Sequence, residues 1–279
     1  MQARLARDQV NRTHPHLTSQ GLRERTATPI DGEHGLEAVA ERFWVGAGKP
    51  PSYPCDLRRD ILWTLPLWVK DVPHLSTRTA NLWAANSRIP YSFAGRDRPL
   101  RGCLLAYRDN GVILLDSEDP TDEQLFTLAH ELAHFLLDYE APRRRALAAL
   151  GEGVRPVLDG QRPPTLDERV HAALERAPLG VMRHLMERPE KGLPTGDVLY
   201  IEDRADRLAL EILAPASLVL SSLKEPASPR PYSEKLAYLS SLLISQYGLP
   251  AALAGEYASY LLARQGRPTF ADWLAGTDM

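Results

Sequence analysis

Apolar and polar positions repeat along the chain with two periods, and each period predicts one class of element. Residues 33–44 and 76–87 carry apolar side chains at helical spacing, and Ser76 stands where an N-cap is expected, so both stretches predict helices. Residues 60–70 form an apolar run of ambiguous type that is broken at Pro66. The first third of the chain is therefore expected to combine helices with at least one buried segment.

A hairpin is expected in the next stretch. Residues 100–109 and 111–116 are two apolar runs joined at Asn110–Gly111. Asn–Gly between apolar runs is a strong signal for a two-residue turn of type I′, because that turn needs positive φ. The pattern therefore predicts two antiparallel strands with Asn110–Gly111 at the turn.

The stretch "TDEQLFTLAHELAHFLLDY", residues 121–139, predicts a helix that begins at Thr121. Thr121 and Gln124 have the spacing of a capping box, and Asp122 and Glu123 would lie at the positive end of the helix dipole. Farther along, residues 199–215 predict a helix that ends at Pro215. Two amphipathic helices, "SEKLAYLSSLLISQYG" and "PAALAGEYASYLLARQG", are expected after it.

Composition narrows the class of protein. Of 279 residues, 44% are hydrophobic and 25% charged, which is typical of a globular protein, and the net charge of −3 gives no overall attraction to nucleic acid or anionic lipid. The N-terminal residues contain no apolar signal-peptide core, and no window approaches the roughly 18 apolar residues of a membrane span. Cys55 and Cys103 are too few for a disulfide framework. We therefore expect a cytoplasmic protein without a membrane partner.

The helix at 121–139 carries the candidate chemistry. On a helical wheel His134 falls about 40° from His130, on the same face and one turn later, while the large apolar side chains fall on the opposite face. Two neutral imidazoles at this spacing can bind one zinc ion, and Glu131 between them can act as general base on a water held there. The alternative is a structural helix that happens to contain two histidines.

A catalytic zinc needs a third protein ligand and one open position. The sequence after His134 lacks the glycine and third histidine of the metzincin pattern. A later helix offers Glu202 as the third ligand and, one turn on, Asp206, which would accept the free N–H of a ligating imidazole. The alternative reading of Glu202 and Asp206 is an exposed pair of charges on a helix.

These segments resemble a known family. "FTLAHELAHFLLD" followed by "EDRADRLALEILAP" is similar to the ImmA/IrrE family of metallopeptidases, and the predicted hairpin resembles the one that precedes the family's zinc helix. The resemblance covers roughly residues 60–140 and 198–265. It places Glu202 at the family's metal-binding glutamate and Asp206 at its usual asparagine. Three departures are a long gap between His134 and Glu202, Ala214 in place of methionine, and the aspartate at 206.

The resemblance implies a Zn²⁺ endopeptidase of bacterial origin that cleaves a helix-turn-helix (XRE-like) repressor and so releases stress, mobile-element or defence genes. Some family members respond to DNA damage, which makes single-stranded DNA a possible activating signal. In the expected reaction Glu131 takes a proton from the attacking water and passes it to the leaving amine. Candidates to stabilise the oxyanion, which the sequence does not rank, are Tyr139, Tyr200, His171 and His184.

Cys103 has two readings. It lies on the predicted strand before the zinc helix, from which a thiolate would be able to occupy the open position of the metal and hold the enzyme latent. The alternative is a small cysteine buried in the core.

Two other classes of function compete with a protease. One is a non-proteolytic regulator that binds a repressor through a zincin-like scaffold. The other is a DNA-binding transcription factor, because "LLISQYGLPAALAGEYASYLL" has a helix-Gly-helix appearance, although it lacks a basic recognition face.

The expected fold is α+β and mostly helical, a zincin-like metallopeptidase with a small antiparallel sheet before the H-E-x-x-H helix. Residues 141–197 are rich in proline and arginine and balance ten basic against eight acidic side chains, which favours a solvated, partly helical insertion. The predicted organisation has four parts: an N-terminal tail and helix (1–50), the sheet and zinc helix (51–140), the insertion (141–197), and the Glu-ligand helix with closing helices (198–279).

Overall fold

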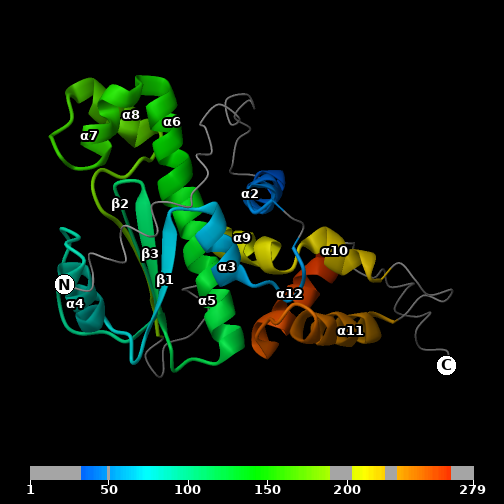
Figure 1. The fold of residues 1–279 in the computed structure, drawn as a ribbon. Coiled ribbons are helices and arrows are strands. Elements are labelled where there is room, and N and C mark those ends of the chain that lie inside the picture. The colour runs from blue at the N-terminus through cyan, green and yellow to red at the C-terminus, as the bar shows by residue number, and fades with distance from the viewer. Residues whose placement is uncertain (1–32, 49–50, 189–202, 224–230, 265–279) are drawn as a thin grey trace. The chain divides into compact units, whose positions relative to one another are not determined.

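A four-stranded sheet with one long helix packed on it forms the centre of the fold (Figure 1). The computed structural model describes residues 33–48, 51–188, 203–223 and 231–264. The elements before the long helix are α2 (Glu33–Gly46), α3 (Leu57–Thr64), β1 (Leu67–Val72), α4 (Thr77–Asn86), β2 (Leu100–Tyr107) and β3 (Asn110–Asp116). Those from the long helix onward are α5 (Thr121–His134), η1 (Phe135–Glu140), α6 (Ala141–Leu150), η2 (Glu152–Val154), α7 (Arg155–Leu158), α8 (Leu166–Leu174), β4 (Met182–Glu187), α9 (Asp203–Leu213), α10 (Ala216–Ser221), α11 (Tyr232–Ser245) and α12 (Ala251–Arg264).

The sheet has the strand order β1-β3-β2-β4 and is mixed. Strands β2 and β3 form the predicted antiparallel hairpin, and β4 pairs antiparallel with β2, but β1 pairs parallel with β3. The α+β, mostly helical fold class predicted from the sequence is confirmed, whereas the expectation of an entirely antiparallel sheet is wrong. The chain leaves β1 through α4 before it returns, and such a crossover permits parallel pairing. Part of residues 141–197 also contributes a strand, β4, to this sheet.

The hairpin turn lies two residues earlier than the sequence predicted. Arg108 and Asp109 have φ values of 51° and 62°, so they are the two central residues with positive φ that a type I′ turn requires. Asn110–Gly111 instead belongs to β3. The glycine is needed for packing, because an added Cβ would lie 2.6 Å from the Leu67 side chain and 2.9 Å from the ring of Phe135. Tertiary packing therefore explains a glycine that we had assigned to the turn.

Helix α5 begins at Thr121, as predicted, but without the expected capping box. Its N-cap residue is Pro120, which has neither a side-chain acceptor nor a backbone N–H and so cannot form a capping box. The Gln124 amide instead donates to the carbonyl oxygens of Ser117 and Asp119, at 3.4 and 2.7 Å. The side chain thus closes the connection between β3 and α5.

Three helical segments follow one another without a break from Thr121 to Leu150. The middle segment, η1, is a π-helix of six residues between the α-helices α5 and α6. Figure 1 shows them as one long rod beside the sheet. π-helical turns are rare and are often found at functional sites.

The two faces of the sheet pack against different helices (Figure 1). On β2, Gly102 faces α5, because a Cβ there would meet Thr127 of that helix. Cys103 and Leu105 belong to an apolar cluster that includes side chains from α4. The buried members of this cluster are Leu75, Ala80, Ala84, Phe93, Leu100, Cys103, Leu105, Val112 and Leu114. Side chains alternate along a strand, so the same four strands serve two separate packing layers.

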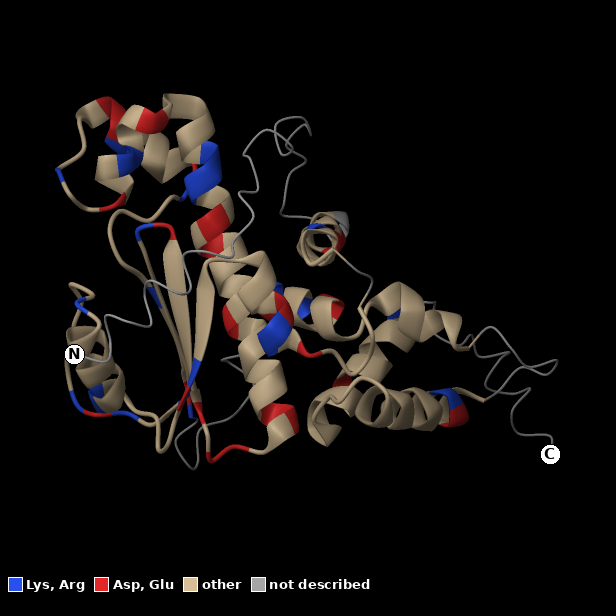
Figure 2. Cartoon of the chain, in the orientation of Figure 1, with Lys and Arg blue, Asp and Glu red and all other residues tan. Residues whose placement is uncertain are grey.

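Helices α6 to α8 enclose a smaller apolar cluster. The buried side chain of Arg143 on α6 forms ion pairs with Asp159 and with Asp109 of the hairpin turn. Basic and acidic side chains are intermixed over these helices in Figure 2. None of the helices in the described ranges is long and apolar enough to cross a membrane.

Candidate metal centre and active site

His130 and His134 lie one turn apart on α5, as the helical spacing predicted, and their Nε2 atoms are 3.2 Å apart. The side chain of His130 is fully buried, and that of His134 is 12% exposed. Two imidazole nitrogens this close together fit two ligands of a single ion, because ligand atoms about 2.0–2.1 Å from a tetrahedral metal lie within van der Waals distance of each other.

Each of these imidazoles has a carboxylate on its other nitrogen. Asp206 of α9 accepts from Nδ1 of His130 at 2.8 Å, and Asp138 of η1 accepts from Nδ1 of His134 at 2.7 Å. A proton held on Nδ1 places the lone pair on Nε2, the atom that faces the neighbouring ring. Carboxylate, imidazole and metal in this order are the usual arrangement around metal-bound histidine. Both rings are thus oriented for metal binding by residues of other segments.

The surroundings of His134 and its partner Asp138 favour a neutral imidazole at His134. Burial lowers the pKa of His134 below its ordinary value, although the hydrogen bond with Asp138 acts in the opposite direction. Burial alone would raise the pKa of Asp138, but the hydrogen bond with His134 and the charge of Arg204 together lower it. Arg204 donates to Asp138 at 2.5 Å. A neutral ring beside an ionised carboxylate is the state that binds a metal.

Glu131 lies between the two histidines in sequence and is completely buried. Its Oε2 accepts from Nδ1 of His184 at 2.9 Å, whereas its Oε1 has no hydrogen-bond partner within the described residues. Room for the carboxylate depends on Gly102 of β2, where a Cβ would stand 3.0 Å from Oε1. A buried carboxylate oxygen without a partner is costly, so it indicates a missing polar group at this point.

His184, on β4, joins the two helix histidines from another element. Its ligand atom and those of His130 and His134 all lie within 4.8 Å of one another, so the three imidazoles form a cluster able to hold a metal ion. Its ring stacks on that of His134, with centroids 3.6 Å apart. From the sequence we could place His184 only among unranked oxyanion candidates. A weak strand signal, with His184 between Met182 and Met186 on one face, was the only local indication of its position.

The other residues singled out from the sequence fall in three places. Glu202 and Tyr200 lie outside the described residues, so the predicted third ligand stays a prediction. Tyr139 is buried, and its hydroxyl oxygen accepts from the backbone N–H of Asp109 in the hairpin turn. His171 lies on the exposed surface of α8. The structure brings neither Tyr139 nor His171 into the histidine cluster.

The placement of Cys103 does not support a latency switch. Its side chain belongs to the apolar cluster on the α4 side of the sheet, while the neighbouring Gly102 faces α5. It is fully buried, and burial raises the pKa of the thiol well above its ordinary value, with the charge of Glu131 adding to the effect. Alternation along β2 directs the side chain away from the histidines, which favours the reading of Cys103 as a core cysteine.

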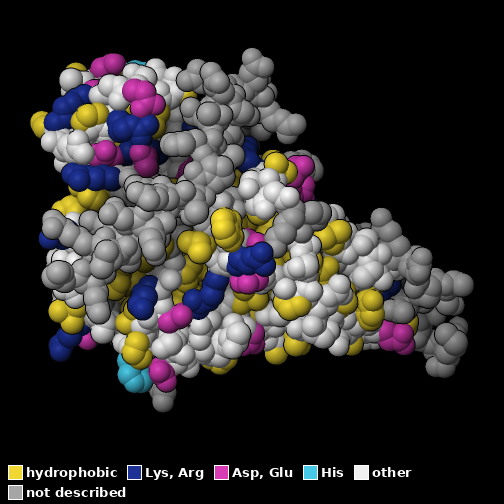
Figure 3. Space-filling view, viewed as in Figure 1, with side chains coloured by type: hydrophobic (Ala, Val, Ile, Leu, Met, Phe, Trp, Pro, Cys, Tyr) yellow, Lys and Arg dark blue, Asp and Glu magenta, His cyan; other side chains and the backbone are white. Residues whose placement is uncertain are grey.

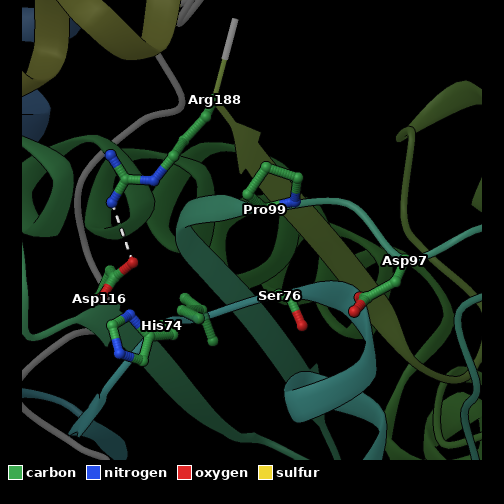
Figure 4. Close-up of a pocket in the computed structure, with 7 residues that line it drawn as sticks. His74, Ser76, Asp97, Pro99, Asp116 and Arg188 are labelled. Carbon is green, nitrogen blue, oxygen red and sulfur yellow. Dashed lines mark hydrogen bonds and ion pairs between the residues drawn. The ribbon is translucent and has the colours of Figure 1, made fainter. Parts of the chain in front are cut away.

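A separate cavity of 280 Å³ lies at the end of the sheet, between the start of α4 and the segment after β4 (Figure 4). Arg188 reaches across it to Asp116 at 2.9 Å. Its lining residues are His74, Leu75, Ser76, Asp97, Pro99, Asp116 and Arg188. None of the three clustered histidines lines this cavity, and its charged groups are paired, Arg188 with Asp116 and Asp97 with Arg78.

Comparison with known proteins agrees with this geometry. Residues 95–151 match the model of the Peptidase_M78 family, described as an IrrE N-terminal-like domain. No curated protein and no solved structure matches the chain. The matched segment contains the hairpin, His130, Glu131 and His134, and it ends before His184 and Asp206. The family match supports the resemblance to the ImmA/IrrE family over residues 95–151, which are similar to an IrrE N-terminal-like domain.

Proposed function

We propose that the protein is a zinc-dependent endopeptidase that cleaves a helix-turn-helix repressor. The family match supports a peptidase of the metal-dependent kind. The observation that carries the proposal is the arrangement around Glu131. A completely buried carboxylate has one oxygen without a partner among the described residues, next to two imidazoles whose Nε2 atoms are 3.2 Å apart.

The donor set favours zinc. Neutral imidazoles bind zinc, copper, iron and nickel. Zinc has no redox chemistry, so it acts as a Lewis acid in hydrolysis without oxidation or reduction of the site. Such an ion, when bound, polarises a substrate carbonyl and makes a nearby water more acidic. His130 and His134 are two of its ligands in this proposal, and Glu202 is the third.

Glu131 would act as the general base. Its unpartnered Oε1 would accept the proton of the attacking water and then deliver it to the amine of the leaving peptide. Glu131 and His130 are both fully buried, so bulk water has little access to the carboxylate. Exclusion of bulk water strengthens the electrostatic interactions of the carboxylate with the charge that develops during the reaction.

The choice of a repressor as substrate rests on the family resemblance. Basic side chains are scattered rather than gathered on the coloured surface in Figure 3, which disfavours the competing reading of a DNA-binding factor. A repressor offers a folded protein substrate with exposed linkers between helices, which an endopeptidase cuts most readily.

Replacement of the base tests the proposal. Glu131→Gln should keep bound zinc and lower the cleavage rate of a helix-turn-helix (XRE-like) repressor by about 10²–10⁴-fold, the usual contribution of a positioned base. The measurement is product formation on denaturing gels with and without a chelator, together with zinc content. Glu118→Gln, the same change at an exposed position before α5, is the matched control. Absence of cleavage by the metal-loaded wild type would favour the non-proteolytic regulator, and cleavage that survives both Glu131→Gln and chelation would contradict the roles proposed for Glu131 and the metal.

A further inference from the structure

We propose that His184 is a positioning residue that holds the Glu131 carboxylate in its working orientation, through a hydrogen bond from strand β4 rather than by ligating the metal. The inference rests on the proposed function, because it concerns the base of the same reaction. It assigns a role to a strand that neither the helix motif nor the family match includes.

The sheet brings His184 to the carboxylate. Strands β2 and β4 pair so that His184 is opposite Leu104, and Met186 is opposite Gly102. Gly102 faces α5, and alternation along the paired strands places His184 on that same face. There Nδ1 of His184 donates to Oε2 of Glu131 at 2.9 Å.

The hydrogen bond leaves the second carboxylate oxygen available for chemistry. Glu131 is enclosed by Gly102 on one side and by His184 on the other, so Oε2 is engaged while Oε1 has no described partner. A glutamate has three rotatable side-chain bonds, and a single donor to one oxygen fixes the direction of the other. Because the general base must lie within about 2.6–3.2 Å of the proton it removes, this fixed direction bears on the rate.

Ring geometry argues against His184 as a metal ligand. Two imidazoles on one tetrahedral ion radiate from it, which places their ring centroids about 5 Å apart when each nitrogen is about 2.0–2.1 Å from the ion. The centroids of His130 and His134 are 4.8 Å apart, which fits this arrangement. The centroids of His130 and His184, 5.2 Å apart, meet the same criterion, but the rings of His134 and His184 are stacked with centroids 3.6 Å apart and an interplanar angle of 18°. With His130 and His134 as the ligand pair, the stacked ring of His184 does not radiate from the same ion.

The experiment uses substitutions that separate the two ring nitrogens. In His184→Asn the side-chain amide replaces the Nδ1 donor, in His184→Gln it replaces Nε2, and in His184→Ala both are absent. Each full-length variant is loaded with Co²⁺, and its metal content is measured. Its affinity for acetohydroxamic acid, which chelates the ion and passes a proton to a neighbouring base, is then measured by absorption titration. His171→Asn, at an exposed position on α8, is the matched control.

We expect all variants to retain one equivalent of metal. Hydroxamate affinity should fall about 10–100-fold in His184→Ala and His184→Gln, as is typical when a supporting hydrogen bond is lost, and stay within about 3-fold of wild type in His184→Asn. Combining His184→Ala with Glu131→Gln should add little to Glu131→Gln alone, because both changes act through one carboxylate.

Three results would overturn the inference: loss of metal from His184→Ala, retained affinity in His184→Gln with loss in His184→Asn, or additive losses in the double variant. Each of these results leaves the proposed function intact, provided that the wild type binds metal and hydroxamate and that Glu131→Gln lowers the affinity for hydroxamate. A wild-type protein that binds no metal contradicts the proposed function itself, so the two failures are distinguishable.

Discussion

The two faces of the central sheet are built from alternate residues of the same strands, yet they differ in kind. The α5 face carries Gly102 and His184 and meets the buried Glu131, so polar groups converge there, and one carboxylate oxygen finds no partner in the described part of the chain. The α4 face carries Cys103 and Leu105 in a cluster of buried apolar side chains. One face concentrates groups whose burial is costly, and the other supplies hydrophobic burial that offsets the cost.

This division implies that stability and activity are separable by substitution. Changes on the α4 face should lower the free energy of unfolding and leave the chemistry of folded molecules unchanged. Changes around the histidines should weaken metal binding or cleavage with less effect on the free energy of unfolding, since functional sites are commonly strained or underpacked relative to the core.

The largest effect is expected for Leu105→Ala on the α4 face. Leu105 is 1% exposed, so its truncation should lower the free energy of unfolding by about 2–5 kcal/mol, while zinc content per folded molecule stays constant. Denaturant unfolding and metal analysis measure the two quantities. Leu82→Ala, at a leucine of α4 that is 61% exposed, should change neither. Loss of zinc from folded Leu105→Ala would show that the faces are coupled.

On the other side, Asp206→Ala should weaken zinc binding about 10–100-fold with little effect on unfolding, because it removes the acceptor on Nδ1 of His130. Asp206→Asn keeps an acceptor oxygen and should lose much less affinity. Competition with a chromophoric chelator gives both constants. Equal losses in the two variants would mean that the charge, rather than the hydrogen bond, supports the imidazole.

Gly102→Ala should affect both properties moderately. The added Cβ would stand 2.6 Å from Thr127 Cγ2 and 3.0 Å from Glu131 Oε1, so α5 must shift away from β2. We expect a loss of about 1–3 kcal/mol in stability, together with slower cleavage. Gly153→Ala is the control, because a Cβ there meets nothing within 4 Å. Unchanged cleavage in Gly102→Ala would show that the fit between strand and base is looser than proposed.

The smallest effect is expected for Cys103→Ala, at about 1 kcal/mol of stability for the lost sulfur. Metal content and basal cleavage should not change, because the thiol lies on the α4 face. A cysteine that capped the metal would give the opposite outcome, with cleavage rising in the variant.

Local patterns in the sequence predicted what local geometry determines. The start of α5 at Thr121, the N-cap Ser76 and the shared face of His130 and His134 follow from spacing within one or two helical turns, and the structure has all of them. These features need no knowledge of distant parts of the chain.

Features set by distant partners were missed or misassigned. Gly111 was read as a turn glycine because its need for space arises from Leu67 and Phe135, which lie elsewhere in the sequence. Strand β4 has little pattern of its own, and His184 reaches Glu131 only because β4 pairs with β2. Pairing between distant strands leaves only a weak signal in either segment.

The π-helical segment η1 has a consequence for how length variation would act on this chain. The i→i+5 hydrogen bonds of a π-helix place about one residue more in each turn than the i→i+4 bonds of an α-helix, so Phe135–Glu140 holds about one residue beyond the α-helical number for the same rotation. Removal of one residue from this segment would let α5 continue into α6 as a regular α-helix with little change of phase, and Arg143 would keep its direction toward Asp109 and Asp159. Removal of one residue from α6 before Arg143 would instead turn that side chain by about 100° relative to the histidines. The π-helical segment is thus the part of this rod that best absorbs the loss of a residue.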